Sequence, residues 1–267
     1  MADEVKPSSR ERLLERGRRE LASRGLRVER LPRPLTLHPE AELRIDLDYV
    51  LARRMAAGGD FYFVQVGAFD GRRYDPIHEW VRAYGWHGLL IEPQPHFFSE
   101  LVKNYEGAEG LEFRQIAIGA HKERRPFYWV ALEEGVTRDA GMIASFDRET
   151  LLSHRKYVPN LDSLLRSEEI DCEPLNDILA AVPSDQVDLL QIDVEGYDHE
   201  LIRVLDLGRF SPSIIRFEHM HLSREQHDAS VGKLVEHGYK VALEENDTLA
   251  YLETELPFGA PDRPAPA

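Results

Sequence analysis

The chain has 267 residues, of which 42% are apolar, enough for one large globular domain with a substantial core. Its 48 acidic residues outnumber 33 lysines and arginines, and the formal net charge of -15 disfavours nucleic acid and membrane surfaces as partners. The apolar runs are too short to span a membrane, the first residues lack a signal-peptide pattern and Cys172 is the single cysteine, so we expect a cytoplasmic protein.

The two ends of the chain differ in composition from the middle. Residues 1–45 begin with a basic stretch in which Ser8 and Glu11 form a capping-box pattern ahead of Leu13. We expect a helical arm that serves as a lid or as a homo-oligomer contact, with a solvated helix as the alternative. The proline-rich residues 256–267 predict a disordered tail. The main domain is therefore expected over residues 46–255.

Within this domain, short apolar runs alternate with helical patterns. This order is typical of an α/β fold with a mostly parallel sheet and helices on both faces. The apolar runs predict strands near residues 61–66, 88–92, 112–118, 187–192 and 213–218. Helical patterns lie near residues 46–57, 76–84, 95–105, 174–181, 197–206 and 223–235. Residues 239–243 and 248–253 predict a closing antiparallel hairpin.

Residues 119–172 break this rhythm. Arg125–Val130 reads as an added strand, and the polar, aromatic region that follows has no clear periodicity. We expect an irregular substrate-side insertion there, because loops commonly carry the residues that recognise ligands.

The first apolar run ends in a glycine turn. Ligands of such folds lie at the carboxyl ends of the strands, so Gly67 and Gly71 would let the backbone approach a cofactor, with Asp70 in the same turn. A tight turn without a ligand is the alternative. The pattern lacks the third glycine of dinucleotide-binding turns, which disfavours a pyrophosphate and a nucleotide-dependent oxidoreductase.

The second apolar run ends in a single carboxylate, Glu92. A carboxylate at this position can accept hydrogen bonds from both hydroxyls of a ribose. Pro93 follows it and favours a structured turn over a frayed end. Together with the glycine turn, Glu92 points to an adenosine-type cofactor.

Acids and imidazoles follow two later strands. Asp193 and Glu195 come after one apolar run, and Glu218 and His219 after the next. These side chains could bind Mg²⁺, with Asp193, Glu218 and His219 as ligands, or supply a general base, for which His219 is the candidate. His221 would point to the same side as His219 on an extended segment. Solvated acids that cap helices are the alternative.

Four motifs together resemble the FkbM-type methyltransferase family. They are Val64-Gln-Val-Gly-Ala-Phe-Asp-Gly71, Ile91-Glu-Pro-Gln-Pro95, Ile192-Asp-Val-Glu-Gly-Tyr-Asp198 and Ile215-Arg-Phe-Glu218. The resemblance covers about residues 60–253 and implies a class I, Rossmann-like methyltransferase that uses S-adenosylmethionine, usually on a hydroxyl of a sugar or secondary metabolite. The closing hairpin suits that fold better than a dehydrogenase sheet.

The resemblance also implies roles for single residues. Gly67, Asp70 and Gly71 would flank the methionine part of the cofactor, Glu92 and Pro93 the ribose, and Ala117 the adenine. Asp193 would lie beside the cofactor and take part in catalysis. Gln65 stands where many methyltransferases have an acid near the methionine ammonium, and its amide can still accept a hydrogen bond. Phe69 departs from the asparagine that is common there.

We therefore expect an S-adenosylmethionine-dependent O-methyltransferase that acts on a small molecule. The protein would mainly align the two reactants and help to remove one proton. An N-methyltransferase and a non-catalytic cofactor-binding or assembly module are the alternatives, the latter because of the N-terminal arm and the acid that is missing at Gln65.

Overall fold

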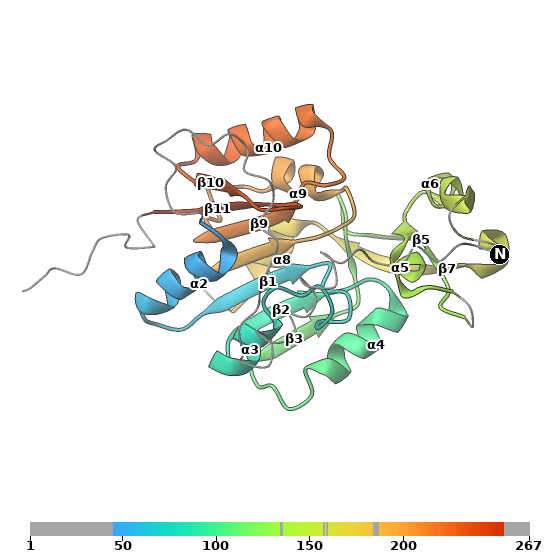
Figure 1. Ribbon diagram of the computed structural model, residues 1–267, viewed down its shortest axis with the longest axis horizontal. Helices are drawn as coiled ribbons and strands as arrows, with labels where there is room; N and C mark the ends of the chain where they lie inside the picture. Colours follow the sequence, from blue (N-terminus) through green and yellow to red (C-terminus); the bar gives the residue numbers. More distant parts are fainter. Residues whose placement is uncertain (1–44, 134–135, 157, 159, 184–186, 254–267) are drawn as a thin grey trace, which may run out of the picture. The chain divides into compact units, whose positions relative to one another are not determined.

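A computed structural model describes residues 45–133, 136–156, 158, 160–183 and 187–253 (Figure 1). The N-terminal arm expected over residues 1–45 lies outside this part of the chain except for Ile45, and the tail expected over 256–267 lies outside it entirely. Both therefore stay predictions. None of the helices in the described ranges is long and apolar enough to cross a membrane.

The described residues form a seven-stranded main sheet with the order β10-β11-β9-β8-β1-β2-β3. Strands β1, β2, β3, β8 and β9 are parallel, and β11 runs antiparallel to both β9 and β10. The expected α/β fold with a closing hairpin is confirmed. The strands span Tyr62–Val66 (β1), His87–Ile91 (β2), Leu111–Arg114 (β3), Leu189–Ile192 (β8), Ile214–Glu218 (β9), Lys240–Leu243 (β10) and Asp247–Tyr251 (β11).

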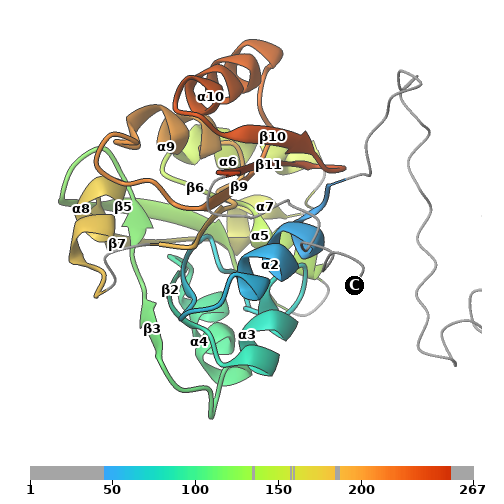
Figure 2. The same ribbon diagram turned by 90° about the vertical axis from the view of Figure 1, so that its left-hand side faces the viewer.

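Helices cover both faces of the main sheet (Figures 1 and 2). One face packs against α8 (Leu175–Ala181), α9 (Asp198–Val204) and α10 (Arg224–Glu236). The other packs against α2 (Leu47–Ala56), α3 (His78–Tyr84) and α4 (Pro95–Asn104). The central strands are apolar on both sides because each face has its own layer of helices.

Local sequence explains where several helices begin. Asp46 caps α2 by accepting a hydrogen bond from the backbone N–H of Tyr49 at 2.9 Å. Ser223 and Gln226 form a capping box at the start of α10. Pro95 is the first residue of α4, a position where its missing N–H costs no hydrogen bond.

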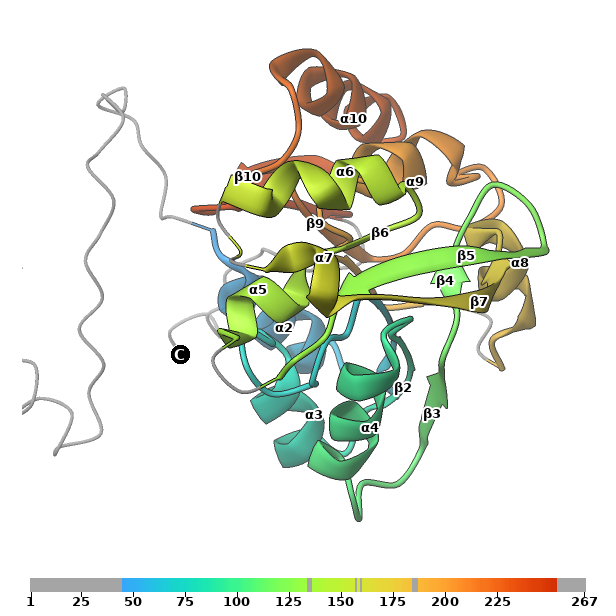
Figure 3. The ribbon, with the colours of Figure 1, turned by 90° about the vertical axis from the view of Figure 1, so that its right-hand side faces the viewer.

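The insertion, residues 119–172, contains the added strand expected over Arg125–Val130, as part of β5, but beyond that strand it is not irregular as expected. With the residues that flank it, it forms a second sheet of order β4-β7-β5-β6 and several short helices (Figure 3). Ile170 and Cys172 alternate with exposed residues in β7, a pattern that could have predicted this strand. The elements are β4 (Ala117–Ile118), β5 (Glu123–Val130), α5 (Arg138–Met142), β6 (Ala144–Ser145), α6 (Arg148–Leu152), η1 (Ser153–Lys156), α7 (Leu161–Leu164) and β7 (Leu165–Glu173).

The predicted strand over residues 112–118 is divided between the two sheets. Its first part is β3, which pairs with β2, and its last part is β4, which pairs with β7. The chain leaves the main sheet between them, and the Arg114 side chain lies 3.3 Å from Glu173 at the end of β7. This crossing places the second sheet beside the carboxyl ends of β1 and β2.

Candidate functional site

Two adjoining clefts lie at the carboxyl ends of β1, β2 and β8. Strand order reverses between β1 and β8, and open α/β sheets bind ligands at such a switch point. The large cleft has a volume of about 430 Å³, and the small cleft about 80 Å³. Both clefts are lined by Gly67, Glu92, Gln94, Met142, Asp193 and Glu195.

The large cleft lies between the strand ends and the second sheet. Pro93 lines it from the main sheet and residues 116–119 line it where the chain enters the second sheet, so the predicted Ala117 is a wall residue. Phe127 and Phe146 come from the insertion and pack edge to face with ring centroids 5.2 Å apart. The Arg125 guanidinium lies 4.3 Å from the centre of the Phe146 ring. The insertion thus gives this cleft an aromatic wall that can contact a flat ring system.

The glycine turn forms the floor where the clefts meet. The backbone N–H groups of Gly67 and Ala68 both donate to the carbonyl of Ile91 at 2.9 Å. Gly67 has φ +78°, and a Cβ there would lie 1.7 Å from the backbone oxygen of Asp193. No other residue type fits without moving the backbone.

Asp70 and Gly71, which were predicted to contact the cofactor, line neither cleft. A Cβ on Gly71 would meet Leu101 of α4 at 2.3 Å. One oxygen of Asp70 accepts hydrogen bonds from the N–H groups of Arg72 and Arg73 at 3.0 and 2.7 Å. The structure therefore places these two residues behind the turn, where they build its shape.

Glu92 lies at the predicted place, between both clefts, and only 4% of its surface is exposed. Its two oxygens accept hydrogen bonds from the N–H groups of Phe69 and Gln94, each at 2.9 Å. Burial raises the pKa of this carboxyl to about 7 despite those bonds. Each oxygen keeps a lone pair for a further donor, such as a ribose hydroxyl.

Two glutamine side chains face the small cleft from neighbouring strands. Gln65 of β1 and Gln191 of β8 are paired in register, and only 3% and 2% of their surfaces are exposed. The side-chain oxygen of each is buried without a hydrogen-bond partner among the described residues. Such oxygens call for a donor from a ligand, because burying them unpaired is unfavourable. Sequence reasoning missed Gln191, although a polar residue within an apolar strand was a signal.

Carboxylates gather at the ends of β8 and β9. Burial and the charge of Glu195 raise the pKa of Asp193 to about 6, with Arg216 and His221 opposing the shift. Burial and the neighbouring carboxylates raise the pKa of Glu218 to about 8. Glu195 has φ +54°, a backbone conformation that is strained for a residue with a side chain. Together these groups form an acidic corner of the site.

The histidine in this acidic corner is His221, not His219. Residues 219–222 form a turn in which the N–H of Leu222 donates to the carbonyl of His219, so the segment is not extended as expected. His221 lies 3.4 Å from Glu195 and 3.7 Å from Glu218. His219 points elsewhere, because its Nδ1 is 3.1 Å from the hydroxyl of Thr248; neither histidine is among the residues that line the clefts.

The same turn changes the candidate metal ligands. Among the described residues, potential ligand atoms of Glu195, Glu218 and His221 lie within 4.8 Å of one another. The predicted set was Asp193, Glu218 and His219. The structure keeps Glu218 in such a group and separates His219 from it.

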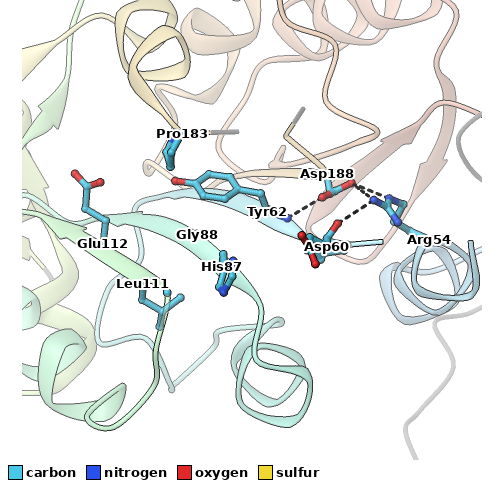
Figure 4. A pocket seen from close by; sticks show the side chains of 11 residues that line it. Arg54, Asp60, Tyr62, His87, Gly88, Leu111, Glu112, Pro183 and Asp188 are labelled. Carbon is cyan, nitrogen blue, oxygen red and sulfur yellow. Dashed lines mark hydrogen bonds and ion pairs between the residues drawn. The ribbon is translucent and has the colours of Figure 1, made fainter. Parts of the chain in front are cut away.

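A third cavity, of about 570 Å³, lies on the side of the main sheet where the parallel strands begin, opposite the two clefts (Figure 4). Its most buried acid is Asp188, which forms an ion pair with Arg54 at 2.7 Å and accepts from the N–H of Tyr62 at 2.7 Å. The cavity lies at the amino ends of the strands, and none of its described lining residues has a buried side-chain nitrogen or oxygen without a hydrogen-bond partner. It therefore lacks the features that mark the two clefts.

Comparison with protein families decides the identity of the domain. The model of the FkbM methyltransferase domain matches residues 65–241, about two thirds of the chain. The chain belongs to the FkbM methyltransferase family. The family is one of S-adenosylmethionine-dependent methyltransferases, and the resemblance inferred from the four motifs is confirmed.

Several solved methyltransferases match this chain at low sequence identity. The methyltransferase FkbM from Methylobacillus flagellatus KT is 15% identical with a TM-score of 0.44; the match covers 72% of this chain and 43% of that one. Precorrin-6y C5,15-methyltransferase from Geobacter metallireducens GS-15 is 13% identical with a TM-score of 0.39, over 76% and 88% of the two chains. An RNA methyltransferase from Salinibacter ruber, solved with S-adenosyl-L-homocysteine, is 13% identical with a TM-score of 0.35, over 83% and 98%. No curated protein matches the chain.

The residues of the FkbM domain fit its cofactor. The large cleft has the size of typical small-molecule sites, about 300–1,000 Å³, and the buried Glu92 is among the residues that line it. The orphaned oxygens of Gln65 and Gln191 lie one strand apart in the small cleft, where a positively charged amino group would pair with them. An elongated molecule with an aromatic and an amino-acid end matches this division.

Proposed function

We propose that this FkbM methyltransferase methylates a hydroxyl oxygen of a small molecule, with Asp193 as the general base. The observation that supports it is the position of Asp193, which lines both clefts at their junction. S-adenosylmethionine supplies an activated methyl group on its sulfonium. The protein has to hold the acceptor oxygen in line with that group and take up the hydroxyl proton.

The cofactor would lie across both clefts. Ala117 and Phe127 would flank the adenine, and Glu92 and Pro93 the ribose. In the small cleft, the buried oxygens of Gln65 and Gln191 would accept hydrogen bonds from the methionine ammonium. These two neutral carbonyls would take the place of the carboxylate that many methyltransferases use for this contact.

Asp193 suits the role of base better than His219. Its raised pKa of about 6 makes it a stronger base than an ordinary carboxylate, yet it is ionised at neutral pH. His219, the base predicted from sequence, bonds to Thr248 away from both clefts. We therefore expect His219→Ala to keep the turnover number within about twofold of the parent.

A small, uncharged and hydroxyl-rich acceptor, such as a sugar or another natural product, is the class that the resemblance to the family implies, and it would approach Asp193 at the junction of the clefts. The methionine part of the cofactor would occupy the small cleft, whose lining of amides and carboxylates also includes Arg73 and Tyr74. The formal charge of -15 disfavours nucleic acid as the acceptor. An amine acceptor is the alternative, because the Asp193 carboxylate, ionised at neutral pH, would attract a cation.

Two experiments test the proposal. Calorimetric titration of the full chain with S-adenosylhomocysteine and with NAD⁺, each with Mg²⁺ and after chelation, should give binding of the first ligand alone. A metal effect would involve Glu195, Glu218 and His221, and its absence would remove the magnesium prediction.

Methyl transfer from labelled S-adenosylmethionine is then measured on matched hydroxyl and amine acceptors. We expect product from a hydroxyl acceptor and a turnover number that rises through about pH 6 and then levels, as Asp193 loses its proton. Transfer only to amines would establish the alternative. Cofactor binding without transfer to any acceptor would contradict the catalytic proposal.

A further inference from the structure

One arginine of the insertion reaches across to the glycine turn. Arg138, the first residue of α5, donates through Nη2 to Asp70 at 2.7 Å and through Nη1 to Glu100 of α4 at 3.2 Å. Its Nη2 also contacts Glu100. A single guanidinium therefore joins the insertion to two separate parts of the main domain.

Aromatic rings hold the same guanidinium from the side. Its central carbon lies 5.4 Å from the ring centre of Phe69 and 5.2 Å from that of Phe97, and the two ring centres are 4.0 Å apart. A cation over such rings is attracted by their negative faces. Phe69 belongs to the glycine turn and has φ +49°. The contact of Arg138 thus reaches a strained residue of the turn.

The contact differs from the other ion pairs of the insertion in its burial. The side chain of Asp70 is 8% exposed and that of Arg138 25%, whereas Arg155 and Asp162 are 55% and 62% exposed. The hydrogen bonds between Arg138 and Glu100 lower the pKa of the Glu100 carboxyl and raise the pKa of the Arg138 guanidinium. Both groups therefore stay charged. Exposed pairs contribute little, while a partly buried, shared guanidinium fixes geometry.

The far end of α5 is fastened as well. The side-chain amide of Gln94 donates to the carbonyl of Met142 at 3.3 Å, and Met142 lines both clefts. Helix α5 is short, five residues, so displacement of Arg138 would be transmitted to Met142. The helix bridges the glycine turn and the junction of the clefts.

We propose that Arg138 is a positioning residue that holds α5, and with it Met142, over the bound cofactor. It would set how long the cofactor and its product stay in the clefts without touching the reacting atoms. The inference rests on the cofactor placement given under the proposed function.

The test compares Arg138→Ala with Arg155→Ala, which removes an exposed arginine of the same insertion. Binding and dissociation of S-adenosylhomocysteine are measured by calorimetry and stopped-flow displacement. We expect a dissociation constant about tenfold higher for Arg138→Ala, mainly through faster dissociation, and no change for Arg155→Ala. Equal dissociation rates in the parent and in Arg138→Ala would overturn the proposal.

Two further variants keep the test decisive if Arg138→Ala does not fold. Glu100→Gln and Arg138→Lys preserve part of the contact, and each should give a dissociation rate between those of the parent and of the fully broken contact. Asp70→Asn added to Arg138→Ala should cost little more, because the shared contact is already lost. Parent-like rates in both partial variants would equally contradict the role. Failure of the parent itself to bind would count against the proposed function instead.

Discussion

Cavities lie at both ends of the strands of the main sheet. The single largest one lies at the amino ends, which we call the amino edge, and the candidate site lies at the carboxyl ends, the carboxyl edge. The cavity at the amino edge measures about 570 Å³, against about 430 and 80 Å³ for the two clefts at the carboxyl edge. Asp188 and Asp193 illustrate the contrast, because they flank the two ends of the same strand, β8. Asp188 is paired with Arg54, whereas Asp193 stands among other carboxylates.

This difference shows that unpaired buried polar groups and strained backbone, rather than cavity volume, mark the site. The carboxyl edge holds orphaned amide oxygens at Gln65 and Gln191, strained backbone at Phe69 and Glu195, and carboxyls with raised pKa values. The polar groups that line the amino edge have no such orphaned atoms within the described residues. Features that cost stability persist where a ligand uses them.

The largest expected effect distinguishes the two aspartates that flank β8, Asp188 and Asp193. Asp193→Asn should lower the turnover number by about 10²–10⁴ and leave the affinity for S-adenosylhomocysteine nearly unchanged, because a general base is lost. Asp188→Asn should do the opposite, with a loss of about 1–3 kcal/mol in the free energy of unfolding and unchanged turnover. Steady-state kinetics, calorimetry and urea denaturation measure these quantities. Equal turnover in the two variants would refute the division of roles.

The next effect concerns the close approach of the backbones of the glycine turn and the loop after β8. Gly67→Ala should abolish cofactor binding and lower the free energy of unfolding by more than about 3 kcal/mol, because its Cβ would overlap the Asp193 carbonyl. Gly85 has φ +63° and open space around its Cβ position, so Gly85→Ala should cost only about 1–2 kcal/mol. Similar urea midpoints for both variants would argue against the tight junction.

A smaller effect, on cofactor binding, distinguishes Glu92, which lines the two clefts, from Glu112, which lines the cavity at the amino ends of the strands. Glu92→Gln should weaken binding of S-adenosylhomocysteine by about 10- to 100-fold, because one amide N–H would face a backbone donor and a charged acceptor would be lost. Glu112 lines the amino-edge cavity with an exposed side chain, and Glu112→Gln should leave binding unchanged. Calorimetry of the two variants sharpens the comparison; parent-like binding by Glu92→Gln would remove the ribose role.

The last prediction concerns the dependence of stability on pH. Glu218 and Asp198 have pKa values raised from 4.5 and 3.8 to about 8 and about 7, so the native state keeps protons that the unfolded chain releases. The free energy of unfolding should therefore fall as pH rises from about 4 to about 8 and level above that. Glu218→Gln should flatten this slope, while Glu245→Gln, at an exposed position, should not. Thermal melts across that range provide the measurement, and a stability that rises with pH in the parent would contradict the assignment.

The sequence by itself determined where most of the parallel strands lie along the chain, the glycine turn, and the places of Glu92 and Asp193 at strand ends. Each rests on a local pattern: an apolar run that must be a strand, followed by the residues at its carboxyl end. Because parallel strands end at one edge, local patterns suffice to bring such residues together.

Tertiary structure alone decided which other side chains join them. The turn after β9 directs His221 to the acids and His219 to Thr248, although the two residues are only two positions apart. Arg138 meets Asp70 across 68 residues of chain, through a second sheet whose packing no local pattern specifies. Side-chain direction in a turn and contacts between distant segments depend on packing of the whole domain, so they follow from the fold rather than from sequence spacing.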